Sequence, residues 1–189
     1  MICLRSIGGP VLALVLSVAT MLAHADEVAE VNQLVKAGQA TEAMAKLEQF
    51  LAFKPKDPQL RFLKGVMLAD SKRTADAMAI FTSLNEDYPE LPEPYNNLAV
   101  LHASLGNYEK ARAALETAVR GNPNYATAWE NLGDVYARLA AQAYSRALAV
   151  DATNTALPPK IAQLGALFTA RPPAAREAVP GHAAKTTPP

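Results

Sequence analysis

Three prolines, Pro55, Pro89 and Pro123, recur at one constant interval in this chain of 189 residues. Apolar residues in front of each proline keep the same period, and they are Ala43, Ala77 and Ala111 together with Leu47, Phe81 and Leu115. A fixed period of about 34 residues is typical of stacked helical hairpins, because one hairpin cannot bury its own apolar face. The period therefore predicts an all-α repeat fold and favours a protein that holds another molecule.

The period divides the chain into hairpins. Within one helical domain over residues 26–170, we predict repeats over residues 27–57, 58–91 and 92–125, a shortened repeat over 126–154, and a capping helix over 156–170. Each of the first three repeats has a proline at its end, which closes a helix because it lacks an N–H donor. The inter-helix turns fall at Gly38-Gln39, Lys72-Arg73 and Gly106-Asn107. A solenoid needs a final element to cover its last apolar face, and the capping helix would do this.

Residues 1–25 have the pattern of a secretory signal peptide. Arg5 precedes an apolar stretch from Val11 to Leu22, which ends in Ala23-His24-Ala25. The alternative is an uncleaved membrane anchor, but this stretch is shorter than the span of about 20 residues that a membrane-crossing helix needs. We therefore expect cleavage after Ala25, export to the periplasm, and no stable membrane span afterwards.

Composition excludes several kinds of site. Cys3 is the one cysteine and lies in the predicted signal peptide, so the remaining chain has no disulfide and no thiolate metal ligand. We expect no metal and no cofactor. Lysine plus arginine and aspartate plus glutamate number 18 each. This balance argues against a nucleic-acid partner, because nucleic-acid-binding proteins usually carry a basic excess.

The third and fourth repeats carry a recognisable signature. The third reads Tyr95-Asn96-Asn97-Leu98-Ala99, then Gly106 to Ala111, then Ala118 and Asn122-Pro123-Asn124; the fourth reads Trp129-Glu130-Asn131-Leu132-Gly133, then Tyr136. These motifs resemble the tetratricopeptide repeat, and the resemblance covers roughly residues 27–154. It implies a right-handed superhelical solenoid in which the first helix of each repeat lines a concave groove for a peptide or a helix.

The resemblance also implies which residues would line this groove. By register they are Phe62, Val66, Asn96, Asn97, Val100, Glu130, Asn131, Asp134 and Arg138. The family's carboxylate clamp is not matched, because Glu130 and Asp134 stand where clamp-type repeats carry basic or amide groups. The groove instead runs from apolar to acidic. We expect a protein or peptide segment with an aliphatic anchor and a positive end.

The fourth repeat is too short for an ordinary hairpin. Tyr136 and Ala147 are closer in the sequence, by five positions, than their counterparts His102 and Ala118. We predict one helix over residues 127–150, with a tight turn near Ala140-Ala141 as the alternative. A continuous helix would leave the face of Tyr144 and Ala147 without its usual cover. That face would then pack on the tail helix or on a second chain, which would make a homodimer.

The remaining candidates for chemistry have structural explanations. Trp129 is expected to be buried between helices, with a ligand-stacking platform as the alternative. Glu130 and Asp134 lie one helical turn apart, and paired carboxylates can do acid–base work. No nucleophile or metal cluster accompanies them, so two solvated acids are expected. His102 is expected to pack in the core. We expect no enzyme.

The sequence thus predicts a non-enzymatic interaction scaffold in the cell envelope. The sequence from Glu130 to Leu148, with its shortened last repeat, is similar to the corresponding part of exported proteobacterial envelope proteins. In those proteins a catalytic or small-ligand domain follows the repeats. The alternative is a binding module for a peptidoglycan fragment or a lipid, which would show an aromatic-lined cavity at the shortened repeat. Residues 171–189 are rich in proline and small residues, and we predict a disordered tail there.

Overall fold

The computed structural model describes residues 27–169. The predicted signal peptide over residues 1–25 and the predicted tail over 171–189 lie outside the described residues. Helices joined by short turns make up the described part of the chain, and it contains no strand. The predicted all-α repeat class is therefore confirmed.

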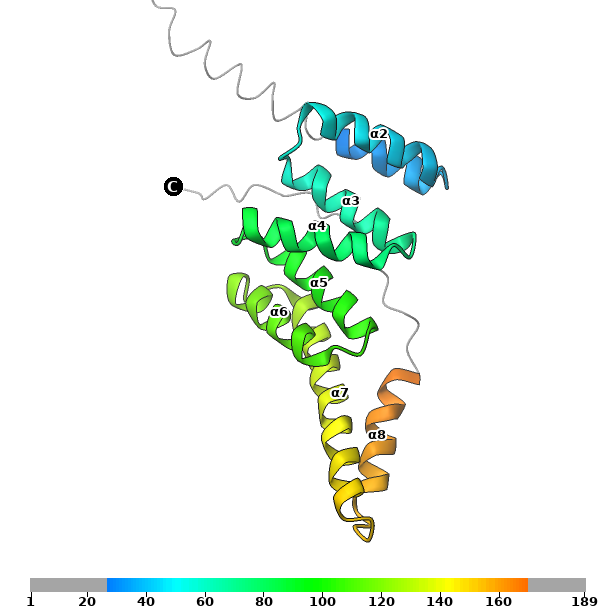
Figure 1. The fold of residues 1–189 in the computed structure, drawn as a ribbon, viewed down its shortest axis with the longest axis vertical. Coiled ribbons are helices and arrows are strands. Elements are labelled where there is room, and N and C mark those ends of the chain that lie inside the picture. Colours follow the sequence, from blue (N-terminus) through cyan, green and yellow to red (C-terminus); the bar gives the residue numbers. More distant parts are fainter. Residues whose placement is uncertain (1–26, 170–189) are drawn as a thin grey trace, which may run out of the picture. The chain divides into compact units, whose positions relative to one another are not determined.

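The chain divides into two compact units, with the boundary between Ile80 and Phe81. The first unit contains a helical segment over residues 27–36, α2 (Ala40–Phe53), α3 (Pro58–Asp70) and the beginning of α4 (Thr74–Asp87). The segment over 27–36 and α2 form a hairpin (Figure 1). The interior of the hairpin contains Val31, Ala43 and Leu47, and each of these side chains is fully buried. The predicted repeat register thus places small and large apolar residues inside this hairpin.

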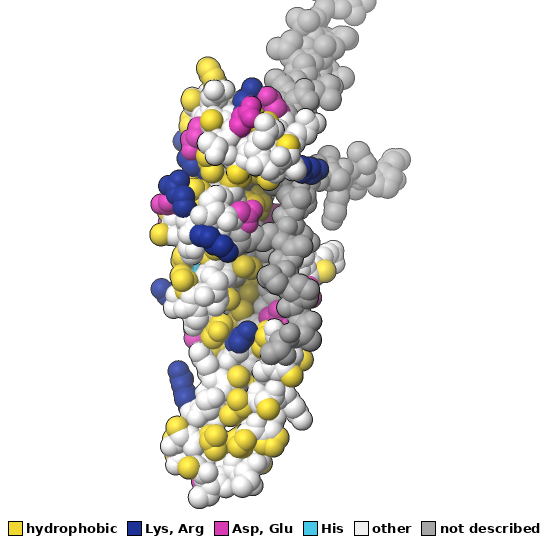
Figure 2. All heavy atoms as spheres, turned by 90° about the vertical axis from the view of Figure 1, so that its right-hand side faces the viewer, with side chains coloured by type: hydrophobic (Ala, Val, Ile, Leu, Met, Phe, Trp, Pro, Cys, Tyr) yellow, Lys and Arg dark blue, Asp and Glu magenta, His cyan; other side chains and the backbone are white. Residues whose placement is uncertain are grey.

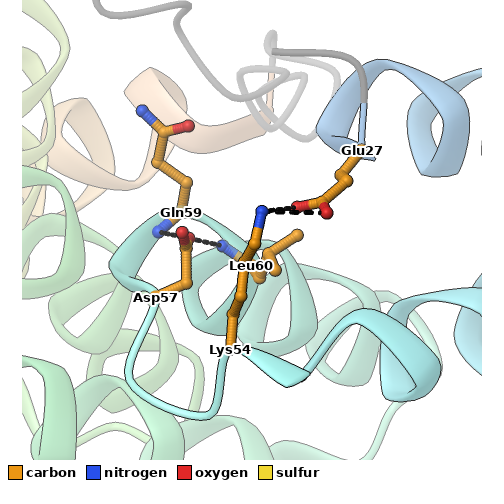
Figure 3. A network of polar contacts seen from close by, with 5 residues as sticks. All are labelled: Glu27, Lys54, Asp57, Gln59 and Leu60. Atoms are coloured by element: carbon orange, nitrogen blue, oxygen red, sulfur yellow. Dashed lines mark hydrogen bonds and ion pairs between the residues drawn. The ribbon is translucent and has the colours of Figure 1, made fainter. Parts of the chain in front are cut away.

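Polar contacts fasten the end of α2 and the start of α3, as Figure 3 shows. The Lys54 Nζ atom lies 2.9 Å from Oε1 and 2.8 Å from Oε2 of Glu27, at the start of the first helical segment. Asp57 caps α3, because its Oδ1 accepts hydrogen bonds from the backbone N–H groups of Gln59 and Leu60 at 3.0 and 2.9 Å. Pro58 follows in the first turn, where its missing N–H costs nothing.

The three inter-helix turns share one backbone conformation. Gly38, Lys72 and Gly106 have φ angles of 76°, 61° and 75°, and each stands one repeat period after the last. In each turn the next residue donates its N–H to a carbonyl five positions back, for example Asn107 to His102 at 2.9 Å. This pattern is a Schellman motif, which ends a helix with a residue in the left-handed region. The turn geometry therefore repeats with the same period as the prolines.

The second unit contains the end of α4, then α5 (Pro92–Ser104), α6 (Tyr108–Gly121), α7 (Ala126–Val150) and α8 (Leu157–Thr169). Helix α6 packs on α5 and on α7, α5 also contacts α7, and α8 packs on α7 alone among the described helices. Figure 1 shows α8 beside the second half of α7. The core consists of Ala99, Ala111, Leu115, Ala118, Val119, Ala128, Leu132 and Val135.

Helix α7 runs for 25 residues without a break. The single helix predicted over residues 127–150 is confirmed, and the alternative turn near Ala140 and Ala141 is wrong. Ala140 stands one repeat period after Gly106, where the pattern calls for another left-handed residue. Alanine favours the helix at that position, and five residues of the usual turn and second helix are missing. The chain therefore continues straight instead of folding back.

The expected burial of Trp129 is wrong. Its side chain is 51% exposed, and its Nε1 donates a hydrogen bond to the Pro123 carbonyl at 2.9 Å. Tyr95, the counterpart in the third repeat, packs against the core that α6 helps to build. In the fourth repeat no second helix folds back over the aromatic ring, because α7 continues. The same shortening that extends α7 therefore uncovers Trp129.

Candidate functional site

A cavity of about 220 Å³ lies among the last four helices of the second unit. Its lining residues are Ala99, Val100 and Ala103 on α5, Tyr108 and Leu115 on α6, Asn131, Asp134, Val135 and Arg138 on α7, and Phe168 on α8. The α7 residues follow steps of three and four, so they share one helical face. The α5 and α6 residues supply an apolar floor, and Asp134 and Arg138 bring opposite charges to the same cavity. We call this site the α5–α7 groove.

The structure brings together part of the predicted site. Val100, Asn131, Asp134 and Arg138 line the groove, and Asn96 is bonded to one of them. Phe62, Val66 and Glu130 are not among the residues that line this groove. Asn97 is also outside it, and its Nδ2 donates to the Glu93 carbonyl one turn back at 3.0 Å. The binding role of the nine residues stays a prediction.

A pair of asparagines joins the two helices that flank the groove. Asn131 Nδ2 on α7 donates a hydrogen bond to Asn96 Oδ1 on α5 at 2.9 Å. Asn96 is 5% exposed, and a buried amide oxygen without a partner would destabilise the fold. The bond therefore satisfies a buried polar group and fixes the side chain of Asn131 at the groove.

Helix α8 contributes an aromatic ring that sequence reasoning did not assign to the site. The guanidinium carbon of Arg138 lies 3.7 Å from the centroid of the Phe168 ring. A guanidinium over an aromatic face is attracted by the ring quadrupole, typically by about 0.5–1 kcal/mol at an exposed site. The helical spacing of Ile161, Leu164 and Phe168 indicates the apolar face of α8, but nothing in that spacing says which helix it meets. Tyr108, Leu115 and Val135 were likewise not predicted as site residues.

The residues expected to mediate self-association have different surroundings. Tyr144 is half-buried, and Lys160 Nζ on α8 lies 5.4 Å from its ring centroid. Ala147 is exposed, and Val150 is 90% exposed at the end of α7. Figure 2 shows apolar side chains at the lower end, where α7 ends and α8 begins. Helix α8 thus covers Tyr144, whereas Ala147 remains exposed to solvent.

His102, next to the groove residue Ala103, has a perturbed pKa. Partial burial, and then the positive charge of Lys110, lower the pKa of His102 below its ordinary value of 6.5. The His102 Nδ1 atom is buried and has no hydrogen-bond partner. His102 is half-buried, so the expected core position is met only in part.

Neither a metal cluster nor a membrane-spanning helix occurs within residues 27–169. No group of three or more histidine, cysteine, aspartate or glutamate side chains in this range could hold a metal ion. No helix in the same range combines the length and the hydropathy that crossing a bilayer requires.

Comparison with known proteins places the repeats in a family. A family described as "Tetratricopeptide repeat" matches residues 28–92, and one described as "TPR repeat" matches residues 101–140. Together the two matches take in more than half of the chain, and they include parts of every hairpin described above. The chain belongs to the tetratricopeptide repeat family. This TPR chain lacks one inter-helix turn, so its fourth repeat departs from the pattern of the other three.

Individual relatives match only in part. Over 79 residues, the chain is 35% identical to the "Tetratricopeptide repeat domain-containing protein PYG7, chloroplastic" of Arabidopsis thaliana. The matched stretch covers 39% of this TPR chain and 26% of that protein. The match thus spans about a quarter of that relative's length.

Two solved structures show the same fold at low identity. The TPR protein TTC0263 of Thermus thermophilus is 23% identical, with a TM-score of 0.56, over 75% of this chain and 81% of that one. The first TPR domain of human RPAP3 is 19% identical, with a TM-score of 0.57, over 63% of this chain and 94% of that one. These similarities support the helical repeat architecture.

Proposed function

We propose that this TPR chain is a non-enzymatic interaction scaffold that holds a segment of a partner protein in the α5–α7 groove. The observation that carries the proposal is the cavity of about 220 Å³ bounded by two successive first helices of the repeats. This volume is several times the about 30 Å³ that one water occupies in the liquid, so it has room for a side chain. The groove thus offers an anchor point for an inserted residue.

The lining suggests the chemistry of the partner segment. Val100, Ala103 and Leu115 supply an apolar floor for an aliphatic side chain. Asp134 lies at the groove, and Glu130 lies one turn earlier on the same helix. Arg138, the basic group here, lies over the Phe168 ring. An anchor residue followed by a positive end therefore fits this surface best, and complementary charge would also favour its encounter.

We further propose that this scaffold works in the periplasm of a proteobacterial cell envelope. The support is the pattern of residues 1–25, a basic start, a short apolar core and a small-residue cleavage site. The test is to express the full chain and to measure its mass and its compartment. A mature chain beginning at Asp26 in the periplasmic fraction is expected, and an uncleaved chain in the cytoplasm would contradict the proposal.

The alternative ligand, a peptidoglycan fragment or a lipid, calls for an aromatic-lined cavity. Tyr108 and Phe168 are the aromatic residues of the groove, and the rest of its apolar lining is aliphatic. Arg138 already lies over the face of Phe168, which leaves less aromatic surface for stacking. A protein segment is therefore the better supported ligand.

Self-association through α7 stays a prediction, supported by the exposed Ala147 and Val150. Tyr144 is a poor site for the test, because a change there would also disturb α8. Ala147→Glu is the better test, because Ala147 is exposed. Light scattering should show dimers of the unaltered chain and monomers of the variant, and a strict monomer before any substitution would remove the idea.

Binding in the groove is tested with defined peptides. Fluorescein-labelled amphipathic peptides, each as long as α8, would carry leucine anchors and either a lysine end or a glutamate end. Fluorescence anisotropy should show tighter binding of the lysine-ended peptide, and Val100→Asp should abolish it. Asp134→Lys should reverse the charge preference, whereas Glu109→Lys makes the same charge change at an exposed residue of α6 that does not line the groove. Equal binding of both peptides by all variants would contradict the proposal.

A further inference from the structure

Helix α8 occupies part of the site where the partner is expected. We propose that α8 is a displaceable intramolecular ligand of the α5–α7 groove, that Phe168 is its anchor, and that a partner helix with an apolar anchor residue takes its place. This inference rests on the proposed function, because it assigns an occupant and a partner class to the same groove. Its evidence is the contact between Phe168 and the groove, together with the low burial of the other side chains of α8.

Phe168 lies where a ligand side chain would lie. It lines the same cavity as Val100 and Asn131, two residues predicted from the repeat register to contact a partner. Its ring also receives the guanidinium of Arg138 at 3.7 Å, and Arg138 is a third residue of the predicted groove. A helix that only covered the end of the repeats would not need to place an aromatic side chain there.

The remainder of α8 buries few side chains. The backbone of α8 lies close to that of α7 alone among the described helices, and Leu157 is its one buried residue among those whose side chains are described. Ile161, Leu164 and Phe168 are half-buried on the inner face, whereas Leu167 on the outer face is 59% exposed. A helix of 13 residues is marginal in water without tertiary contacts. Apart from Leu157, the described side chains of α8 are thus at most half-buried, and a competing helix would have to replace its packing on α7.

The chain connection makes α8 an effective competitor. A short linker holds a segment near its site at an effective concentration of the order of millimolar. The linker here is the turn over residues 151–156 between α7 and α8. If α8 is docked in about nine of ten molecules, the apparent dissociation constant of any partner rises by about tenfold. Loosening α8 should therefore tighten binding in trans without changing the groove.

The experiment uses α8 itself as the probe. A fluorescein-labelled peptide of residues 156–170 is titrated with the chain from Asp26 to Pro189, either unaltered or with Phe168→Ala. We expect the peptide to bind the Phe168→Ala chain at least about tenfold more tightly than the unaltered chain. Leu167→Ala is the matched control, because it shortens an exposed residue in the same turn, and it should leave the affinity unchanged. A peptide with alanine in place of Phe168 should bind at least about tenfold more weakly.

One further variant keeps the result decisive. Ile161→Ala loosens the other end of α8 without touching Phe168 or the groove, and it should raise peptide affinity in the same direction if Phe168→Ala fails to fold. Equal affinity of the peptide for all folded chains, or no binding to any of them, would overturn the inference and make α8 a fixed cap.

Failure of the inference and failure of the proposed function give different results. If the lysine-ended peptides bind the unaltered and Phe168→Ala chains equally, the function stands and the inference fails. If only the α8 peptide binds, α8 is the ligand of the groove and the scaffold proposal for foreign peptides fails.

Discussion

Asn131 on α7 donates a hydrogen bond of 2.9 Å to the Oδ1 atom of Asn96 on α5. The two residues come from successive repeats, and their bond joins the helices on either side of the α5–α7 groove. Asn96 is almost completely buried, so the bond is made away from competing water. The groove is therefore fixed by a polar contact as well as by the apolar core beneath it.

Removal of this bond should destabilise the second unit. Asn131→Ala leaves the Asn96 oxygen buried without its partner, and such a group typically costs about 1–3 kcal/mol. Urea denaturation followed by circular dichroism should show a lower midpoint. Thr117→Ala is the control, because Thr117 bonds the Ala113 carbonyl of its own helix and should change stability by less than about 0.5 kcal/mol. Equal effects of both changes would contradict a linking role for Asn131.

Trp129 should behave as a surface residue. Trp129→Ala should lower the free energy of unfolding by less than the ~3–5 kcal/mol that a buried aromatic costs. Because the chain has one tryptophan, its fluorescence reports on this position alone. We expect emission at long wavelength and ready quenching by acrylamide in the folded state. A blue-shifted emission protected from acrylamide would show that the ring is covered, for example by a second chain.

The left-handed turn at Lys72 predicts a stabilising substitution. A non-glycine residue with a positive φ carries about 1–2 kcal/mol of strain, and the equivalent turns use Gly38 and Gly106. Lys72→Gly should raise the free energy of unfolding by about 0.5–1 kcal/mol, because part of the gain is lost to the entropy of the unfolded chain. Lys72→Ala keeps a Cβ atom and should not stabilise. Thermal unfolding of the three chains measures the difference.

Proline in the middle of α7 tests its continuity. Ala140→Pro removes a helical hydrogen bond and clashes with the preceding turn, which costs about 3 kcal/mol or more in a helix interior. The helical circular dichroism signal should fall, and the urea midpoint should drop. Ala126→Pro places proline at the first residue of α7, where it is tolerated, and serves as the control. Little effect of Ala140→Pro would favour a turn at that position in solution.

His102 should make stability depend on pH. The folded chain holds the pKa of His102 below 6.5, so in this range the unfolded chain binds more protons than the folded chain. Stability should therefore fall as the pH drops through about 6.5 and should level off below the folded-state pKa. Urea midpoints measured from mildly acidic to mildly basic pH give the slope. His102→Gln should have a flatter profile, and an unchanged profile would assign the pH dependence to other groups.

The sequence by itself determined the repeats and the long helix. The repeat period places a proline after each hairpin and a left-handed turn within each, because these are local requirements of backbone geometry. The missing five residues in the fourth repeat leave no room for a turn, so a continuous α7 could also be predicted. The local backbone preferences of the residues and the length of each repeat decide such features, and contacts between residues far apart in the chain are not needed to predict them.

Only the tertiary structure decided what lies in the groove. The spacing of apolar residues in α8 shows which face is buried, but the direction in which α8 packs along α7 places Phe168 against Arg138. The exposure of Trp129 likewise depends on whether a second helix returns over it. Both outcomes follow from contacts between residues far apart in the chain. Apolar attraction is non-directional, so the periodicity of a helix shows which of its faces is buried but not which helix that face packs against.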